Sequence, residues 1–467
     1  MKFPAALAFA VVVAGCAAGP DYHPKVPETA ARFATAEGAG LTQEIPDADW
    51  WREFKDPTLD KLIEQAAASN YDVRIAIANL RASRALLRGG RLELGPIVTA
   101  QGSATREKTS DAAGIAYDID GDYYDAGFDA SWEIDIFGRV RRSVEALRAD
   151  YESEEAAWRD TLRSVVGEVA RTYVELRGVQ YRFAVAERNI VNQEETYQLT
   201  LALLEGGRGS DLDIARALAQ LETTRASIGP LQAAETEAIN RLKVLLGGDS
   251  AELLALAGSR QELPHPPELI AVDDPAGMLR RRPDIRAVER QLAAATARTG
   301  MAVADYFPRV TLSGSVGRNA TSLADLGDAA AERYSFGPTI SWAALDMGRV
   351  RARVAANDAR AEAALANWEK TVQTALQETE SALNRYSRTR ESAARLRIAA
   401  SSSAKAADLA RLRYRYGADS FLTVLDSERR LLEAEDLLAA AETDASLAAV
   451  AVYKSLGGGW EPFVSGK

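Results

Sequence analysis

Two stretches of the chain alternate between apolar and polar residues, as β-strands with one buried face do. In residues 124–135 the apolar series is Tyr124, Ala126, Phe128, Ala130, Trp132 and Ile134. Residues 97–105 alternate more weakly, and the second half of the chain repeats both patterns. We therefore predict two strand hairpins, at about 96–135 and 308–344, with strands of roughly ten residues.

Long helical segments follow each hairpin. No proline interrupts residues 97–229, and the second half has an equivalent stretch. A helix over 139–204 would be about 100 Å long at ~1.5 Å per residue, ending at Gly206 and Gly207. The returning helices are shorter than the long helices beside which they run. We expect the helices that precede each strand hairpin to cover the rest of each long helix. Gly229 and Pro230 are expected to kink the first returning helix.

The two halves of the chain share one plan. A shift of 210 residues places Trp132 on Trp342, Gly207 on Gly417 and Ser210 on Ser420. Such a long common register indicates a tandem duplication. The predicted fold is mainly α with a membrane β-barrel contribution, built from a duplicated helix, strand, strand, long helix and helix unit.

These patterns predict the domain boundaries. They are a signal peptide at 1–15, a lipidated N-terminal tether at 16–50, a first repeat at 51–262, a linker at 263–272, a second repeat at 273–457 and a tail at 458–467. Within the repeats, the long helix hairpins are expected at about 139–246 and 349–456.

The N-terminus has the features of a secretion signal. Lys2 precedes an apolar stretch that ends in small residues before Cys16, and it is too short to cross ~30 Å of hydrocarbon. An ordinary signal peptide with an incidental cysteine is one interpretation. The other is a lipoprotein signal, because the run resembles the bacterial lipobox and Cys16 is the only cysteine in the sequence. We favour acylation of Cys16.

Composition narrows the classes of function. Hydrophobic residues make up 47% of the chain and the formal net charge is -11, which disfavours disorder and nucleic-acid binding. One cysteine and two histidines leave few metal ligands or catalytic groups. We expect no enzyme activity, no cofactor and no metal. The arginines at 280–282 are expected to form ion pairs rather than a binding site.

The apolar strand faces suggest contact with lipid. No stretch of the mature chain approaches ~18 apolar residues, so a membrane crossing would require a closed β-barrel. Aromatic residues near the ends of the apolar faces would form the interfacial girdles; they are Tyr124, Trp132, Tyr334 and Trp342. A soluble, half-buried sheet would alternate in the same way. The secretion signal and the duplication favour the membrane interpretation.

A sheet of four strands cannot close on itself. Its two edges would leave backbone groups unpaired in lipid, at several kcal/mol each. A ring of identical chains removes the edges. A ring of two, three or more chains would satisfy this argument, and the sequence alone does not determine the number of chains.

Several motifs together resemble one known family. They are Gly19-Pro20-Asp21-Tyr22 after the lipobox, Phe54-Lys55-Asp56-Pro57, the run Arg281 to Arg286, Phe307-Pro308, and Tyr416-Gly417 followed by Leu422 to Asp426. The chain resembles the lipoprotein branch of the TolC-like outer membrane efflux proteins, of the OprM/NodT type.

This resemblance implies a homotrimer in the outer membrane of a Gram-negative bacterium, lipid-anchored and extending into the periplasm. It implies a twelve-stranded barrel continuous with a twelve-helix tunnel. The implied partners are a periplasmic adaptor (membrane fusion) protein, an inner-membrane pump, often of the resistance-nodulation-division type, and outer membrane lipid. The implied function is a passive exit duct for small toxic compounds or drugs.

The resemblance also implies a gate at Leu422 and Asp426. Their spacing of four places both on one helical face, and a ring of carboxylates would repel itself and attract cations. The alternative is that Leu422 is packed within the chain and Asp426 pairs with Arg430.

The turns at the ends of the long helices are candidates for adaptor docking, because glycine allows a partner's backbone to approach closely. The residues concerned are Gly207, Gly209, Ser210, Leu212, Gly417 and Ser420. The alternative is a helix-helix turn that needs glycine for its own geometry, and both interpretations can hold together.

Two other functions remain open at this point. One is the exit duct of a protein secretion system, although the lipobox favours drug efflux. The other is a periplasmic coiled-coil adaptor lipoprotein, although adaptors usually have a single helical hairpin.

Overall fold

The computed structural model describes residues 17–24, 27–35, 40–108, 120–248 and 250–464. These residues form two compact units. The first takes its residues from 1–25, 79–155 and 287–369, and the second from 26–78, 156–286 and 370–467. Among the described residues, no helix is apolar over a length that would cross a lipid bilayer.

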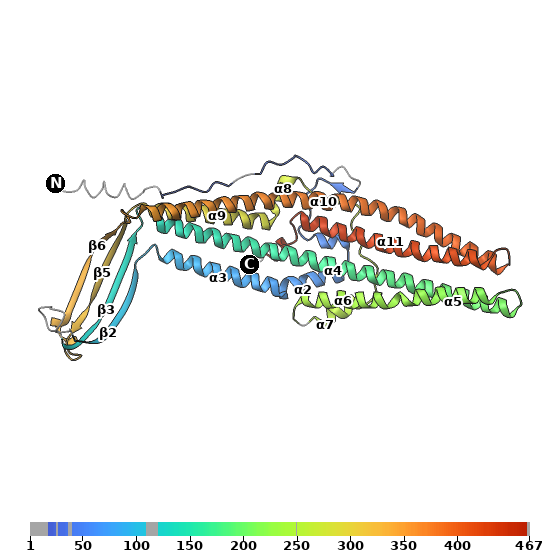
Figure 1. Ribbon diagram of the computed structural model, residues 1–467, viewed down its shortest axis with the longest axis horizontal. Helices are drawn as coiled ribbons and strands as arrows, with labels where there is room; N and C mark the ends of the chain where they lie inside the picture. Colours follow the sequence, from blue (N-terminus) through green and yellow to red (C-terminus); the bar gives the residue numbers. More distant parts are fainter. Residues whose placement is uncertain (1–16, 25–26, 36–39, 109–119, 249, 465–467) are drawn as a thin grey trace. The chain divides into compact units, whose positions relative to one another are not determined.

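The first unit contains a four-stranded antiparallel sheet in the order β2-β3-β5-β6 (Figure 1). The strands are β2 (Ile97–Lys108), β3 (Asp120–Ile134), β5 (Arg309–Ala320) and β6 (Glu332–Ser341). Each hairpin lies inside its predicted interval, and β3 pairs with β5 to join them. β3 has 15 residues and is longer than expected.

Four long helices adjoin the strands. α3 (Tyr71–Leu92) and α9 (Pro283–Ala304) precede β2 and β5, while α4 (Arg139–Glu205) and α10 (Met347–Arg415) follow β3 and β6. The start of α4 is stabilised by Asp135, whose carboxylate accepts the N–H groups of Val140 and Arg141 over 3.1 and 2.8 Å. These are amides that an α-helix itself leaves unpaired.

Two helical hairpins belong to the second unit. The end of α4 turns into α5 (Asp211–Ala226), which is followed by α6 (Ile228–Leu246), and α10 turns into α11 (Phe421–Ser455). The break between α5 and α6 falls at Ser227. It confirms the interruption expected at Gly229 and Pro230, because the first turn of a helix tolerates proline.

Short elements complete the second unit around a buried aromatic core. Trp50 stacks on Tyr453 with ring centroids 5.0 Å apart, and Trp51 stacks on Phe463 at 5.7 Å. The parallel pair β1 and β4 ties residues 41–42 to the linker between the repeats. The elements are β1 (Leu41–Thr42), η1 (Trp50–Phe54), α2 (Pro57–Ser69), α7 (Ala251–Gly258), β4 (Ile270–Ala271), α8 (Pro275–Arg281) and η5 (Glu461–Phe463). Two further 3-10 turns of the first unit, η3 (Asp325–Gly327) and η4 (Ala329–Ala331), precede β6.

Candidate functional site: sheet faces, helix tip and anchoring clusters

The strand register gathers the apolar residues on one face of the sheet. Phe128 lies opposite Ala100 on β2 and opposite Val316 on β5, and Val316 lies opposite Tyr334 on β6. Because side chains alternate along a strand, the even-numbered positions of all four strands share this face. Phe128, Val316 and Tyr334 are exposed in the single chain. The sheet therefore presents an unpartnered apolar face, which we call the apolar face.

The opposite, polar face carries an ion pair that joins the two hairpins. Arg333 on β6 reaches across β5 and donates two hydrogen bonds to Asp125 on β3, each over 2.6 Å. It also donates to the hydroxyl of Ser315 on β5, over 3.3 Å. Two parallel N–H bonds to one carboxylate fix the geometry of both partners. This contact holds three strands in register from the polar side.

The tryptophans predicted for an aromatic girdle occupy equivalent places in the two repeats. The Trp132 indole donates to the carbonyl of Leu94, just before β2, over 3.0 Å. The Trp342 indole donates over 3.0 Å to the carbonyl of Tyr306, just before β5. Both tryptophans therefore lie where the strands meet the helices. The register places Tyr124 and Tyr334 farther along the strands, toward the hairpin loops.

α4 and α10 end in the same backbone motif. After α4, the N–H groups of Gly207 and Arg208 donate to carbonyls in the last helical turn, over 2.8 Å each. After α10, Gly417 and Ala418 make the equivalent bonds, over 2.9 and 2.8 Å. These two hydrogen bonds define the Schellman motif, in which the residue that follows the helix end adopts a left-handed backbone conformation. Both glycines have φ of 73°, so each turn requires glycine for its own geometry.

The two hairpin ends pack on each other through a small core, which we call the tip core. It consists of Ala217, Ala410, Tyr414, Phe421 and Val424, all buried, with side chains of α4 packed around them. The rings of Tyr414 and Phe421 lie 5.6 Å apart. The tip is thus a packed assembly of both repeats rather than two independent loops.

The predicted docking residues differ in their local roles. Ser210 caps α5, accepting the Asp213 N–H over 3.3 Å, and Leu212 is exposed. A side chain at Gly209 would lie within 2.9 Å of the backbone of Leu204, so this position has no room for one. Ser420 makes no capping bond with its side chain.

Asp419 makes the side-chain hydrogen bonds at the start of α11. Its carboxylate accepts the Ser420 N–H and the Thr423 hydroxyl, each over 2.8 Å. These hydrogen bonds lower the pKa of Asp419. The Asp419 carboxylate thus links the residue before α11 to a side chain of its first turn.

The two predicted gate residues lie on α11 next to the tip core. Leu422 is 57% exposed in the single chain. Asp426 accepts hydrogen bonds from Arg430 over 2.8 Å and Arg429 over 3.0 Å. The local pairing considered for Asp426 is therefore present, with one arginine more than expected. Hydrogen bonds from both arginines lower the pKa of Asp426, and Arg430 contributes most.

A buried glutamate near the tip was not predicted. Glu428 on α11 is 2% exposed and accepts hydrogen bonds from Arg411 on α10 over 2.7 Å and Thr196 on α4 over 2.6 Å. The three partners come from separate helices. The three residues also lie apart in the sequence. Hydrophobic periodicity describes residues within one helix or strand, so it could not predict this contact.

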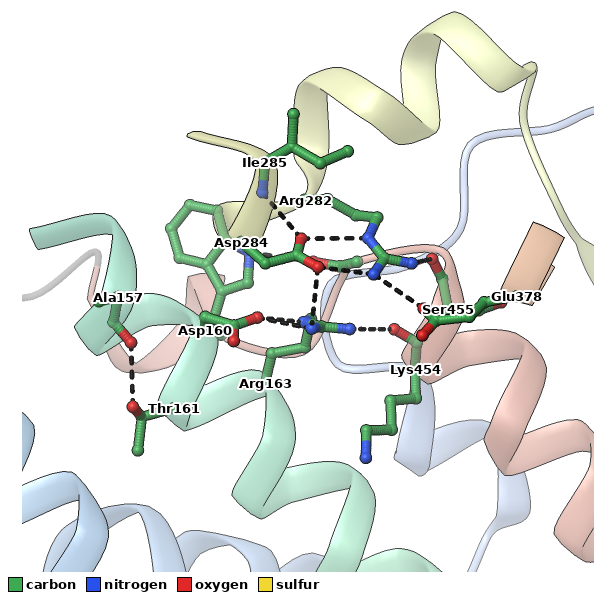
Figure 2. Close-up of polar contacts among 12 residues, drawn as sticks. Ala157, Asp160, Thr161, Arg163, Arg282, Asp284, Ile285, Glu378, Lys454 and Ser455 are labelled. Carbon is green, nitrogen blue, oxygen red and sulfur yellow. Dashed lines mark hydrogen bonds and ion pairs between the residues drawn. The ribbon is translucent and has the colours of Figure 1, made fainter. Parts of the chain in front are cut away.

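Asp284, near the start of α9, joins two buried arginines (Figure 2). Arg282 donates to both oxygens of Asp284, over 3.1 and 2.6 Å, and Arg163 lies 3.7 Å from the same carboxylate. Burial alone would raise the pKa of Asp284. The hydrogen bonds from Arg282 and the charge of Arg163 outweigh burial, so the pKa lies below its ordinary value.

The same two arginines cap the end of α11. Arg163 donates to the carbonyl of Lys454 over 2.8 Å, and Arg282 donates to the carbonyl of Ser455 over 3.1 Å. These carbonyls belong to the last turn of the helix, where cations are favourable. Arg282 also contacts Glu378 at 3.0 Å, and Arg281 contacts Asp273 at 2.7 Å, so the expected ion pairs are present for these two of the three arginines at 280–282. We call this group the belt cluster.

The N-terminal segment is packed rather than free where the structure describes it. Within the first unit, the Ala18 N–H donates to the carbonyl of Phe137, between β3 and α4, over 2.9 Å. The side chain of Arg142 is 4% exposed and contacts Asp21 at 2.6 Å. Tyr22 donates to Glu289 on α9 over 2.7 Å. The predicted lipidation residue, Cys16, lies outside the described residues.

Comparison with known proteins identifies the family. A sequence profile described as "Outer membrane efflux protein" matches residues 62–248 and 276–458. The chain belongs to the outer membrane efflux protein family. It is 31% identical to outer membrane protein OprJ of Pseudomonas aeruginosa, over 98% of this chain and 95% of that protein. It is 32% identical to the toluene efflux pump outer membrane protein TtgC of Pseudomonas putida, over 97% of this chain and 94% of that protein.

A solved structure of the same family confirms the fold. The outer-membrane channel OprN superposes with a TM-score of 0.90 at 42% identity, covering 96% of this chain and all of that one. The predicted fold class and the resemblance to TolC-like efflux proteins are therefore confirmed. As an outer membrane efflux protein, the chain acts at the outer membrane as an exit duct.

Proposed function

We propose that three copies of this chain form a lipid-anchored duct that passively conducts small toxic compounds or drugs out of the cell. The compounds would come from an inner-membrane pump, of the resistance-nodulation-division type, through a periplasmic adaptor protein. The observation that carries the proposal is the two-faced, four-stranded sheet with an unpaired strand at each edge. The family match favours this assignment over an adaptor lipoprotein, and the efflux names of the relatives favour it over protein secretion.

The edges of the sheet explain why copies are needed. In the described sheet, β2 pairs only with β3, and β6 pairs only with β5. Each open edge in lipid would leave backbone N–H and C=O groups unpaired, at several kcal/mol per group. Pairing β2 of one copy with β6 of the next satisfies both edges. Three copies give twelve strands, which enclose a channel rather than a filled interior.

The two faces of the sheet assign its inside and outside. The apolar face, with Phe128 and Val316, would contact lipid, and the tryptophans at the strand ends would lie at the membrane interface. The polar face, with its Arg333 and Asp125 pair, would line the water-filled interior. Acylation of Cys16 would add a lipid anchor to the membrane contact that the sheet makes.

At the other end of the long helices, the tip turns would receive the adaptor. A Cβ atom added at Gly207 would meet no other atom within 4 Å, so this glycine is open to a partner as well as needed for its turn. Leu422 is exposed in the single chain and would form the narrowest ring. Since Asp426 is already paired with two arginines, its ring would repel itself less than unpaired carboxylates would.

Cysteine labelling in outer membranes tests the two faces. We expect a water-soluble, membrane-impermeant maleimide to label the variant Asp129→Cys, on the polar face, and not Phe128→Cys, on the apolar face. The parent chain, whose single cysteine is Cys16, is the control for background. Equal labelling of both variants would contradict the assignment of the faces. Loss of the gene should also increase sensitivity to compounds that the pump exports.

A further inference from the structure

A hollow lies where the sheet meets the helices of the first unit, and we call it the junction hollow. Its volume is about 440 Å³, and it is lined by residues of α4, α9 and α10, by Asp305 just after α9, and by the first residue of β5. Four arginines surround it, Arg139, Arg298, Arg309 and Arg353, and its apolar lining includes Leu147 and Met301. Volumes of roughly 300–1,000 Å³ are typical of sites for small molecules.

The arginines exceed the carboxylates that pair with them. Arg309 contacts Asp305 at 2.5 Å, and Arg353 pairs with the same carboxylate, whose side chain is 11% exposed. Two guanidinium groups therefore share one nearly buried anion. Both arginines are about half exposed. Each guanidinium has five N–H donors, so most of them remain available to another acceptor.

The other two arginines are paired one to one. Arg298 contacts Asp150 at 2.5 Å, and Arg139 contacts Glu133 at 2.6 Å. The hollow as a whole keeps a surplus of positive charge from the pair of arginines at Asp305. An anion that bridged Arg309 and Arg353 would make charge-assisted hydrogen bonds and neutralise this surplus.

The junction hollow continues the polar face of the sheet. Glu133, the partner of Arg139, and Arg309 both occupy odd-numbered strand positions, like Asp125 and Asp129. The N-terminal segment packs on another side of α9, where a side chain at Gly300 would meet the backbone of Ala18. Arg298 is two residues from Gly300, about 200° around the helix, and so faces away from that segment.

We propose that the junction hollow binds small amphipathic anions on their way through the duct, with their acidic group at Arg309 and Arg353. Their apolar part would lie on Leu147 and Met301. The chemical class is an aromatic or aliphatic carboxylate, sulfonate or sulfate. This proposal rests on the proposed function, because the polar face must line the interior for cargo to reach the hollow.

Block of ion current by naphthalene-2-sulfonate tests the proposal. The full chain is purified, reconstituted in planar bilayers, and titrated with this probe. We expect a saturable decrease of the current, and a half-blocking concentration about tenfold higher in Arg353→Gln, which is the loss of one hydrogen bond to a charged group. The control Arg351→Gln removes the same charge two residues away, outside the hollow, and should stay within about twofold of the parent.

Two comparisons distinguish binding in the junction hollow from a general effect of charge on the current. The cation 2-naphthyltrimethylammonium should show no weakening of block in Arg353→Gln. An equal effect of Arg351→Gln and Arg353→Gln on the sulfonate would show a general electrostatic effect and overturn the site, as would the absence of block.

A second measurement separates this proposal from the proposed function. If the protein conducts no current, the duct assignment fails. Equilibrium dialysis of radiolabelled naphthalene-2-sulfonate against the detergent-solubilised chain, with detergent alone as the blank, then decides the site. Binding that Arg353→Gln weakens and Arg351→Gln does not weaken supports the junction hollow. Identical binding in the parent and both variants contradicts it.

Discussion

Replacing Asp284 by asparagine tests how the end of α11 is held. The change preserves the shape of the side chain and removes the negative charge between two arginines that are 3% and 7% exposed. The asparagine oxygen can still accept one hydrogen bond from Arg282. The asparagine NH₂ group, however, would stand where the second carboxylate oxygen now accepts from Arg282, and it cannot accept. Both arginines would then carry less compensated charge in a buried site.

The expected cost follows from the partners that remain. Removing one member of a buried ion pair typically costs ~3–5 kcal/mol. Arg282 keeps Glu378 at 3.0 Å, and Arg163 keeps Asp160 at 2.5 Å, so we expect the lower end of this range. About 3 kcal/mol of local stability corresponds to roughly a hundredfold change in an opening equilibrium.

Hydrogen exchange followed by mass spectrometry measures that equilibrium. We expect amides in the last two turns of α11 to exchange roughly a hundredfold faster in Asp284→Asn, because both arginines that cap this helix end are loosened. The control Asp408→Asn has the same charge change at an exposed ion pair, where the effect should be within about 1 kcal/mol. Unchanged exchange at the end of α11 would refute the belt cluster as its anchor.

The pH dependence gives an independent check. The pKa of Asp284 in the folded chain is lower than in the unfolded chain, so ionised Asp284 stabilises the fold at neutral pH. This contribution is fully present above the unfolded pKa, about 4, and is lost as the pH falls through the folded pKa. The difference between the parent and Asp284→Asn should therefore be constant from about pH 7 to 5 and shrink only below about pH 4.

Three further predictions concern the tip and the N-terminal segment. Gly207→Leu should abolish export in a drug-susceptibility assay while trimers still form, and export at the parent level would contradict docking at this turn. Leu422→Ala should raise the single-channel conductance with a change in stability of less than about 0.5 kcal/mol, because the side chain is exposed in the single chain. An unchanged conductance would argue against a ring at Leu422. Arg142→Met should make residues 17–24 sensitive to limited proteolysis, whereas the exposed Arg148→Met should not, and equal resistance of both would show that Arg142 does not hold the segment.

The fold was largely predictable because its signals are local and repeated. The alternation at 124–135 marked β3, and the absence of proline marked the long helices. The duplication supported each prediction with a second copy. Gly207 and Gly417 marked the helix ends within two residues, because the Schellman motif demands a residue that tolerates positive φ.

The polar contacts were less predictable because they join distant segments. Glu428 with Thr196, and Arg163 with Asp284, are separated by more than a hundred residues, and hydrophobic periodicity has no means of pairing them. The break between α2 and α3 at Asn70 depends on a distant segment as well, because the Asn70 side chain donates to the carbonyl of Leu245 and accepts the N–H of Asp72. The roles of the predicted gate, docking and lipidation residues remain predictions.

Native mass spectrometry of the purified chain in detergent tests the central claim most directly. If the open edges β2 and β6 are satisfied by copies of the same chain, the dominant species will be a trimer of the 50.3 kDa chain, or of the shorter chain that removal of the predicted signal peptide would leave. A monomer that remains folded and stable in detergent, with both sheet edges free, would contradict the account.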